Sequence, residues 1–101
     1  MHVISRKALR DFAAHHSGAD QPLRSWFKLM TASKASNLAE LKRTFSTADY
    51  VSVKQREIYV FNMGGNKYRI VSEINFKRQM AYIRFVLTHN EYTTGQWKAA
   101  L

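Results

Sequence analysis

The stretch that decides the predicted fold reads Ile58-Tyr59-Val60-Phe61-Asn62-Met63-Gly64-Gly65-Asn66-Lys67-Tyr68-Arg69-Ile70-Val71. Residues 58–62 and 67–76 have the composition and alternation of strands, and a glycine pair between two such runs favours a hairpin. Lys77-Arg78 marks a second turn, and the period-two pattern resumes from Met80 to Leu87. We therefore predict an antiparallel sheet with strands at about 58–62, 67–76 and 80–87.

The half of the chain before Tyr50 has a helical period instead. Apolar residues recur at helical spacing after Ser5, an N-cap candidate, and predict a helix over about 6–16. A second helix is expected to begin after Asp20, its N-cap candidate, and to run to about Ala35. Asn37 with Glu40 has the spacing of a capping box before a short third helix. Residues 1–4 are a possible edge strand. The predicted class is α+β, with two N-terminal helices on one face of a small antiparallel sheet and a short C-terminal helical turn.

Composition narrows the classes of function. The 101 residues suit one domain over 1–101, and the absence of cysteine excludes disulfide scaffolds, thiolate zinc sites and cysteine nucleophiles. Sixteen Lys and Arg against seven Asp and Glu give a net charge of +9, which favours a polyanionic partner such as nucleic acid. A solvated basic surface, or a face matched to an acidic protein, is the alternative. We expect a cytoplasmic protein with no membrane contact, because neither a signal peptide nor an apolar span is present.

Strand parity predicts where the positive charge gathers. Side chains alternate between the faces of a sheet, and we expect the side chains of Ala81, Ile83, Phe85 and Leu87 to face the helices. A two-residue glycine turn pairs Asn62 with Lys67, and a tight second turn sets Arg84 opposite Val71, diagonal to Arg69. The exposed face is then predicted to carry a candidate RNA-binding set: Asn62, Lys67, Arg69, Tyr82 and Arg84. Clustered like charges destabilise a sheet, so anion binding explains this set better than stability does.

The third strand ends in Thr88-His89-Asn90-Glu91-Tyr92, which adds an imidazole and a phenol to the predicted cations. RNA transesterification needs a base for the 2′-hydroxyl, a cation for the developing charge and an acid for the leaving oxygen. No metal is needed when the 2′-hydroxyl itself attacks, and no metal site or cofactor is expected. A lone histidine is more often structural, and the sequence leaves open whether His89 acts as general base or general acid. Trp97 is expected to pack in the core, with base stacking as the alternative.

These motifs together resemble a known family. The run Tyr59–Val71, followed by Tyr82-Ile83-Arg84 and by Thr88–Tyr92, is similar to the HigB toxins of the RelE-like toxin–antitoxin superfamily, and the opening His2–Leu9 also fits. The resemblance covers essentially the whole chain. It implies an endoribonuclease, an mRNA interferase that cuts messenger RNA, typically in the ribosomal A site. It also implies a helix-turn-helix antitoxin that neutralises the toxin, with operator DNA bound only through the toxin–antitoxin complex.

Site residues are carried over from the family position by position. The resemblance implies that Lys67, Arg69 and Arg84 hold the scissile phosphate, and that His89 and Tyr92 occupy the catalytic and base-stacking positions. Many relatives have aspartate after the tyrosine, whereas Thr93 stands here, so an acid from that position is missing. The alternative function is a non-catalytic basic domain that binds RNA or an acidic partner, or a decayed toxin.

Overall fold

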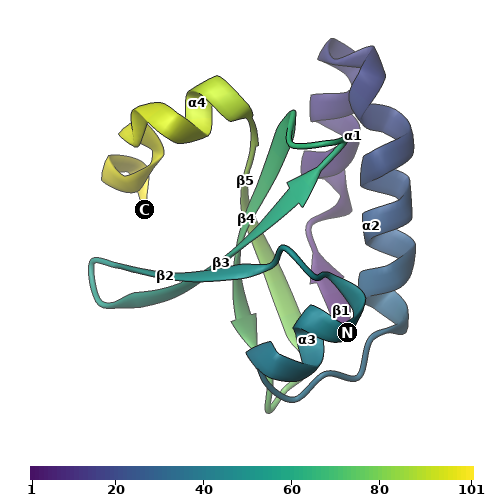
Figure 1. The fold of residues 1–101 in the computed structure, drawn as a ribbon, viewed down its shortest axis with the longest axis vertical. Coiled ribbons are helices and arrows are strands. Elements are labelled where there is room, and N and C mark those ends of the chain that lie inside the picture. The colour runs from purple at the N-terminus through teal and green to yellow at the C-terminus, as the bar shows by residue number, and fades with distance from the viewer.

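The computed structural model describes the whole chain, Met1–Leu101. Helices α1 and α2 lie on one side of a five-stranded sheet of order β1-β5-β4-β3-β2, which is antiparallel except for the β1–β5 pair (Figure 1). The α+β class and the edge strand are confirmed. The elements in chain order are β1 (His2–Ile4), α1 (Arg6–His15), the 3-10 helix η1 (Ser17–Ala19), α2 (Asp20–Ala32), α3 (Leu38–Thr44), β2 (Asp49–Val53), β3 (Arg56–Met63), β4 (Tyr68–Asn75), β5 (Met80–Thr88), α4 (His89–Thr94) and the 3-10 helix η2 (Gln96–Ala100).

Local caps explain where the helices begin. The Ser5 side chain accepts the Lys7 N–H at the start of α1, as predicted. Helix α2 follows η1 directly, so Asp20 is its first residue rather than its cap and the helix ends earlier than expected. Asn37 caps α3, but the Glu40 carboxylate accepts the N–H of Ser36 instead of closing a capping box on Asn37.

Strand β2 is an element that the sequence patterns did not predict. It pairs with β3 through ladder positions such as Val51 opposite Ile58. The turn between the two strands is Lys54-Gln55, and both residues have positive φ, 52° and 65°. Hairpin turns with this backbone normally carry Gly or Asn, so the usual sequence signal is missing here.

The helical side of the sheet holds the larger core. Trp26 of α2 is 1% exposed and packs edge-on against Phe61 of β3 at 5.4 Å between ring centroids. Leu23, Met30 and Ile70 are buried around them. The buried side chains of α2 therefore form a core stripe, which fixes this helix on this face of the sheet.

A β-bulge in β5 overturns part of the parity prediction. The predicted register holds from Asn75 opposite Met80 to Ser72 opposite Ile83, but Val71 then pairs with Phe85. Arg84 is the extra residue of the bulge, and every later side chain of β5 changes face. Phe85 and Leu87 were expected to face the helices and instead share the face of Arg69; Val86 packs on the helical side. Neither Gly nor Pro marks the bulge, so parity counted along the sequence was wrong beyond it.

The glycine hairpin is longer than predicted. Its turn spans residues 64–67, with positive φ at Gly64, Gly65 and Asn66, and Lys67 lies in the turn rather than in β4. Asn62 consequently pairs with Arg69 instead of Lys67. The shift is two residues, so the face assigned to Asn62 was still right.

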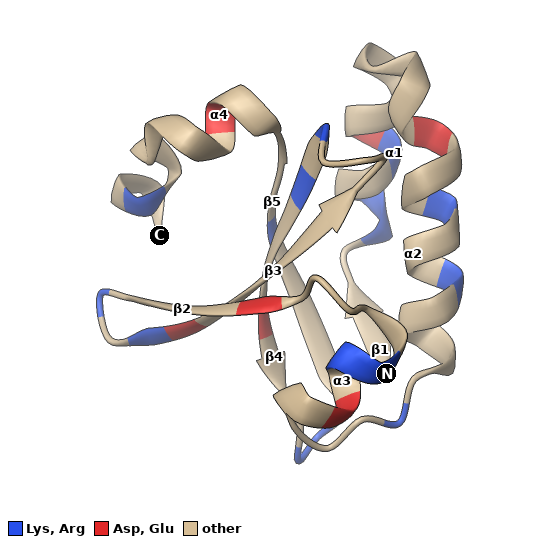
Figure 2. Ribbon diagram, in the orientation of Figure 1, with Lys and Arg blue, Asp and Glu red and all other residues tan.

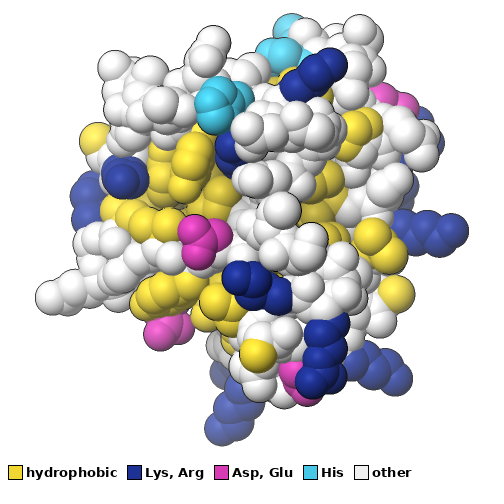
Figure 3. All heavy atoms as spheres, viewed as in Figure 1, with side chains coloured by type: hydrophobic (Ala, Val, Ile, Leu, Met, Phe, Trp, Pro, Cys, Tyr) yellow, Lys and Arg dark blue, Asp and Glu magenta, His cyan; other side chains and the backbone are white.

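The C-terminal segment covers the middle of the second face, an arrangement that the sequence analysis did not include. Trp97 is 5% exposed and packs with Val60 and Val71, and its indole N–H donates to the Tyr92 carbonyl at 3.0 Å. The Lys54 ammonium group holds the end of the chain through the carbonyls of Ala99 and Leu101. Apolar side chains show at the surface beside this segment (Figure 3). Core packing of Trp97 is confirmed.

Candidate active site at the end of β5

Arg69, His89 and Tyr92 meet where β5 passes into α4. The Arg69 Nη2 lies 2.9 Å from Nδ1 of His89, and its guanidinium carbon is 5.4 Å from the centroid of the Tyr92 ring. The backbone N–H of His89 donates to the Lys67 carbonyl at 2.8 Å, which ties the start of α4 to the glycine hairpin. Three of the predicted site residues are thus in direct contact.

The Arg69 side chain is buried, with 6% of the residue exposed. Its Nη1 donates to the carbonyls of Asn66 and Tyr68 at 3.1 and 3.2 Å, and its Nη2 donates to Oδ1 of Asn66 at 2.6 Å. Buried charges persist only with such partners. Arg69 therefore has a structural role in the hairpin turn as well as its contact with His89.

The contact with Arg69 determines which nitrogen of His89 is available to a ligand. A guanidinium group has donors only, so Nδ1 must accept. A neutral ring then carries its proton on Nε2. His89 is exposed, and in this tautomer its Nε2–H is a hydrogen-bond donor toward a ligand; Nε2 can accept a proton only when the ring proton moves to Nδ1 and the contact with Arg69 opens.

Tyr92 supplies a protonated hydroxyl. Burial raises the pKa of Tyr92 above its usual 10, the Arg69 charge acts in the opposite direction, and Asp49 raises it further. The phenol is therefore neutral at physiological pH. Asp49 stands opposite Val60 on β2, on the same face. Asp49 was not among the predicted site residues, because the strand that carries it was not predicted.

Two further predicted residues border this cluster. Asn62 is exposed and directly opposite Arg69 across the β3–β4 ladder. Lys67 is exposed in the hairpin turn, and its ammonium group forms no ion pair. Lys67 is therefore a cation beside His89 that is free to bind an anion.

Arg84 and Tyr82 lie elsewhere on the face. The Arg84 Nε is 3.3 Å from Oε1 of Glu73, and Arg56 reaches the same oxygen at 3.3 Å. Tyr82 stands opposite Glu73, and its hydroxyl donates to the sulfur of Met80 at 3.4 Å. The bulge, not a diagonal register with Arg69, determines the place of Arg84. Arg56 was not singled out by the sequence analysis, because only the observed β3–β4 register brings it to Glu73.

Helix α4 has no free acid to replace an aspartate at position 93. The Thr93 hydroxyl donates to the His89 carbonyl at 2.8 Å. Glu91 completes a capping box with Thr88, its carboxylate accepting the Thr88 N–H at 2.8 Å. The side chains of α4 thus stabilise its own first turn and hold His89 in place.

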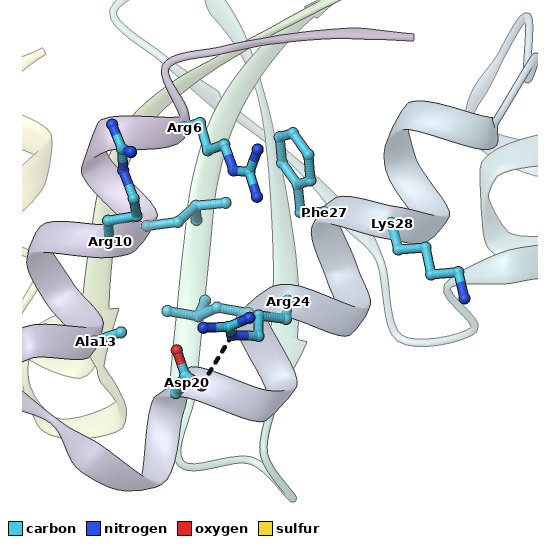
Figure 4. Close-up of a pocket in the computed structure, with 9 residues that line it drawn as sticks. Arg6, Arg10, Ala13, Asp20, Arg24, Phe27 and Lys28 are labelled. Atoms are coloured by element: carbon cyan, nitrogen blue, oxygen red, sulfur yellow. Dashed lines mark hydrogen bonds and ion pairs between the residues drawn. The ribbon is translucent and has the colours of Figure 1, made fainter.

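A hollow of ≈ 280 Å³ lies between α1 and α2, on the helical side of the sheet (Figure 4). Arg6 stacks on Phe27 there, with 4.7 Å from its guanidinium carbon to the ring centroid, and Arg24 pairs with Asp20. No histidine lines this hollow, so it lacks the group that gives the His89 cluster its capacity for proton transfer near neutrality.

Basic residues are dispersed over the fold rather than gathered in one element. Lys and Arg lie on helices, strands and turns (Figure 2). No three His, Asp or Glu side chains gather in a way that could hold a metal ion. None of the helices has the length and apolar character needed to cross a bilayer.

Comparison with known proteins places this geometry in a family. A family model described as "HigB_toxin, RelE-like toxic component of a toxin-antitoxin system" matches residues 19–95. The mRNA interferase toxin HigB of Escherichia coli (strain K12) is 35% identical over 92 residues, which are 91% of this chain and 88% of that protein. The mRNA interferase HigB of Shigella flexneri has the same identity and coverage, and that of Escherichia coli O6:H1 is 25% identical over the same length. The chain belongs to the HigB family of RelE-like toxins.

Proposed function

We propose that the chain is an mRNA interferase, an endoribonuclease that acts as the toxin of a toxin–antitoxin pair. Its relatives bear the name mRNA interferase HigB. The observation that carries the proposal is the contact between Arg69 and Nδ1 of His89 at 2.9 Å. It holds an exposed imidazole beside Arg69, next to the phenol of Tyr92 and to the hairpin turn that carries Lys67.

The proposed reaction is attack by the 2′-hydroxyl of the RNA on the adjacent phosphorus. The P–O2′ bond forms, the P–O5′ bond breaks, the 2′ proton leaves and the 5′ oxygen gains a proton. His89 takes the 2′ proton at Nε2 once its own ring proton lies on Nδ1 and the contact with Arg69 has opened, or, when protonated, it supplies the proton that the 5′ oxygen gains; the other proton is exchanged with Tyr92 or with water. Lys67 with Arg69 stabilises the charge that develops on the phosphate. Tyr92 donates from its neutral hydroxyl or stacks on a base. The products are a 2′,3′-cyclic phosphate and a 5′-hydroxyl, and no metal-bound water takes part.

The roles of the remaining site residues follow their positions. Arg69 is largely used inside the protein, so its main part is to position His89 while it adds positive potential. Asn62 lies close enough across the ladder to bind a ribose or base edge. Arg84 and Tyr82 contact RNA farther along the face, away from the bond that is cut.

The proposed setting is the bacterial cytoplasm. We propose that cleavage takes place on messenger RNA in the ribosomal A site, and that a helix-turn-helix antitoxin encoded nearby neutralises the chain. Operator DNA is then bound by the toxin–antitoxin complex only. A net charge of +9 is consistent with two polyanionic surroundings, messenger and ribosomal RNA.

The test is to induce the chain in growing cells and map the 5′ ends of their RNA. We expect growth arrest and new 5′ ends inside reading frames, and we expect both to disappear when the antitoxin is co-expressed. The purified chain, treated with EDTA beforehand, should cut the same messages in a ribosome-containing extract. The cut should leave cyclic phosphate ends. Binding to RNA without new ends, by a folded chain at matched expression, would contradict the proposal and favour a non-catalytic RNA-binding domain.

A further inference from the structure

Glu73 lies between two arginines on the same face as the His89 cluster. Its carboxylate accepts from Arg56 of β3 and from Arg84 of β5, with each closest contact at 3.3 Å. The side chains are 26%, 46% and 44% exposed respectively, so all three can be reached from solvent. Two guanidinium groups share one carboxylate, and the trio keeps a net positive charge.

The bulge is what assembles this trio. Ile58 pairs with Glu73, so Arg56 lies two residues farther along the same face of β3. Arg84 is the extra residue of β5, and its guanidinium is directed to Glu73 rather than to Arg69. Exposed ion pairs contribute only about 0–1 kcal/mol to stability. Bulges often re-aim a side chain next to a functional site.

The surroundings of the trio suit a nucleotide. A groove beside it is lined by the aromatic residues Tyr82 and Phe76, by Asn75 and Arg56, and also by the carboxylates of Glu57 and Glu73. Tyr82 pairs directly with Glu73 across the β4–β5 ladder. Glu73 is four positions from Arg69 along β4, which is roughly 13 Å in an extended strand. The trio therefore lies on the same surface as His89 but outside its reach.

We propose that Arg56 and Arg84 form a second phosphate-binding site for single-stranded RNA, flanking the bond that is cut, and that Glu73 occupies this site until RNA displaces it. A carboxylate and a phosphate present comparable oxygen pairs to guanidinium donors. Tyr82 then offers a ring for the neighbouring base. The inference rests on the proposed function and adds a consequence: the carboxylate of Glu73 weakens RNA binding.

The experiment measures binding of a fluorescent twelve-nucleotide RNA, fully 2′-O-methylated so that it is not cut, by anisotropy across a salt series. Glu73→Gln and Asp20→Asn each remove one negative charge from an ion pair, but Asp20 lies on α2, on the other side of the sheet. We expect Glu73→Gln to tighten binding about three- to tenfold at low salt and Asp20→Asn to leave it within about twofold.

The arginines give the complementary comparison. Arg56→Gln should weaken binding about three- to tenfold and reduce the slope of log K against log salt by about 0.7. Arg24→Gln, which removes the partner of Asp20, is the control. It should change neither the affinity for RNA nor the salt slope.

The outcomes separate this inference from the function on which it rests. Equal effects of Glu73→Gln and Asp20→Asn, with RNA bound and cut normally by the unaltered chain, would overturn the second site and leave the endoribonuclease proposal standing. Weaker binding by Glu73→Gln would also overturn it. An unaltered chain that neither binds nor cuts RNA would overturn both.

Discussion

Replacing Arg69 by alanine removes four hydrogen bonds from a residue that is 6% exposed. Hydrogen bonds of charged groups contribute about 1.5–3 kcal/mol each when they are fully buried. Asn66 and His89 are exposed, so water replaces much of what their groups lose, whereas the Tyr68 carbonyl loses a buried partner. We therefore expect a loss of about 2–4 kcal/mol in the free energy of unfolding, well below the sum of the four bonds.

The matched control for Arg69→Ala is Arg84→Ala. Arg84 is 44% exposed and forms a surface ion pair, so its removal should cost at most about 1 kcal/mol. Urea unfolding followed by tryptophan fluorescence measures both variants, with the m-value as a check that the unfolded states are alike. A loss for Arg69→Ala no larger than that for Arg84→Ala would refute the structural role assigned to Arg69.

Three further predictions concern the stability of the fold. Trp97→Ala should cost about 3–5 kcal/mol by thermal unfolding, because the indole is the buried centre of the second face. Gly65→Ala should cost about 1–2 kcal/mol for its positive φ, and Gly64→Ala should lower the melting temperature further, because a methyl group there lies 3.1 Å from an aromatic ring carbon. Hydrogen bonds from Ser36 hold the pKa of Glu40 below its usual 4.5. This stabilisation is full above pH 4.5 and is lost as the pH falls through the folded value, so Ser36→Ala should lower the urea midpoint at pH 7, and the difference from the unaltered chain should shrink as the pH is lowered below 4.5.

Local signals predicted most of the fold. Ser5 and Asn37 cap their helices through contacts two or three residues away, and such short-range chemistry is visible in the sequence. Strand β2 and the bulge at Arg84 have no comparable marker. The turn Lys54-Gln55 adopts positive φ without glycine, and the bulge is a property of the β4–β5 pair rather than of either strand.

The residues of the candidate site likewise fall into those that were predicted from the sequence and those that were not. His89 and Tyr92 were found from the end of the third strand and from the family resemblance, and the structure brings both to Arg69. Asp49 and Arg56 were not predicted. Each is brought to this face by a strand pairing, β2–β3 or β3–β4, that cannot be read from the turn residues. Arg84 was placed in diagonal register with Arg69 because nothing in the sequence marks the bulge at which its side chain turns to Glu73.

The most direct test of the central claim is the rate at which the His89→Gln variant cuts messenger RNA. Glutamine keeps the approximate size and polarity of histidine but transfers no proton near neutrality. Loss of a positioned acid or base typically lowers a rate by ~10²–10⁴-fold. We predict a loss of that size in the ribosome-containing extract, with antitoxin binding and the melting temperature unchanged. Cleavage within about threefold of the unaltered chain would contradict the account and remove His89 from the mechanism.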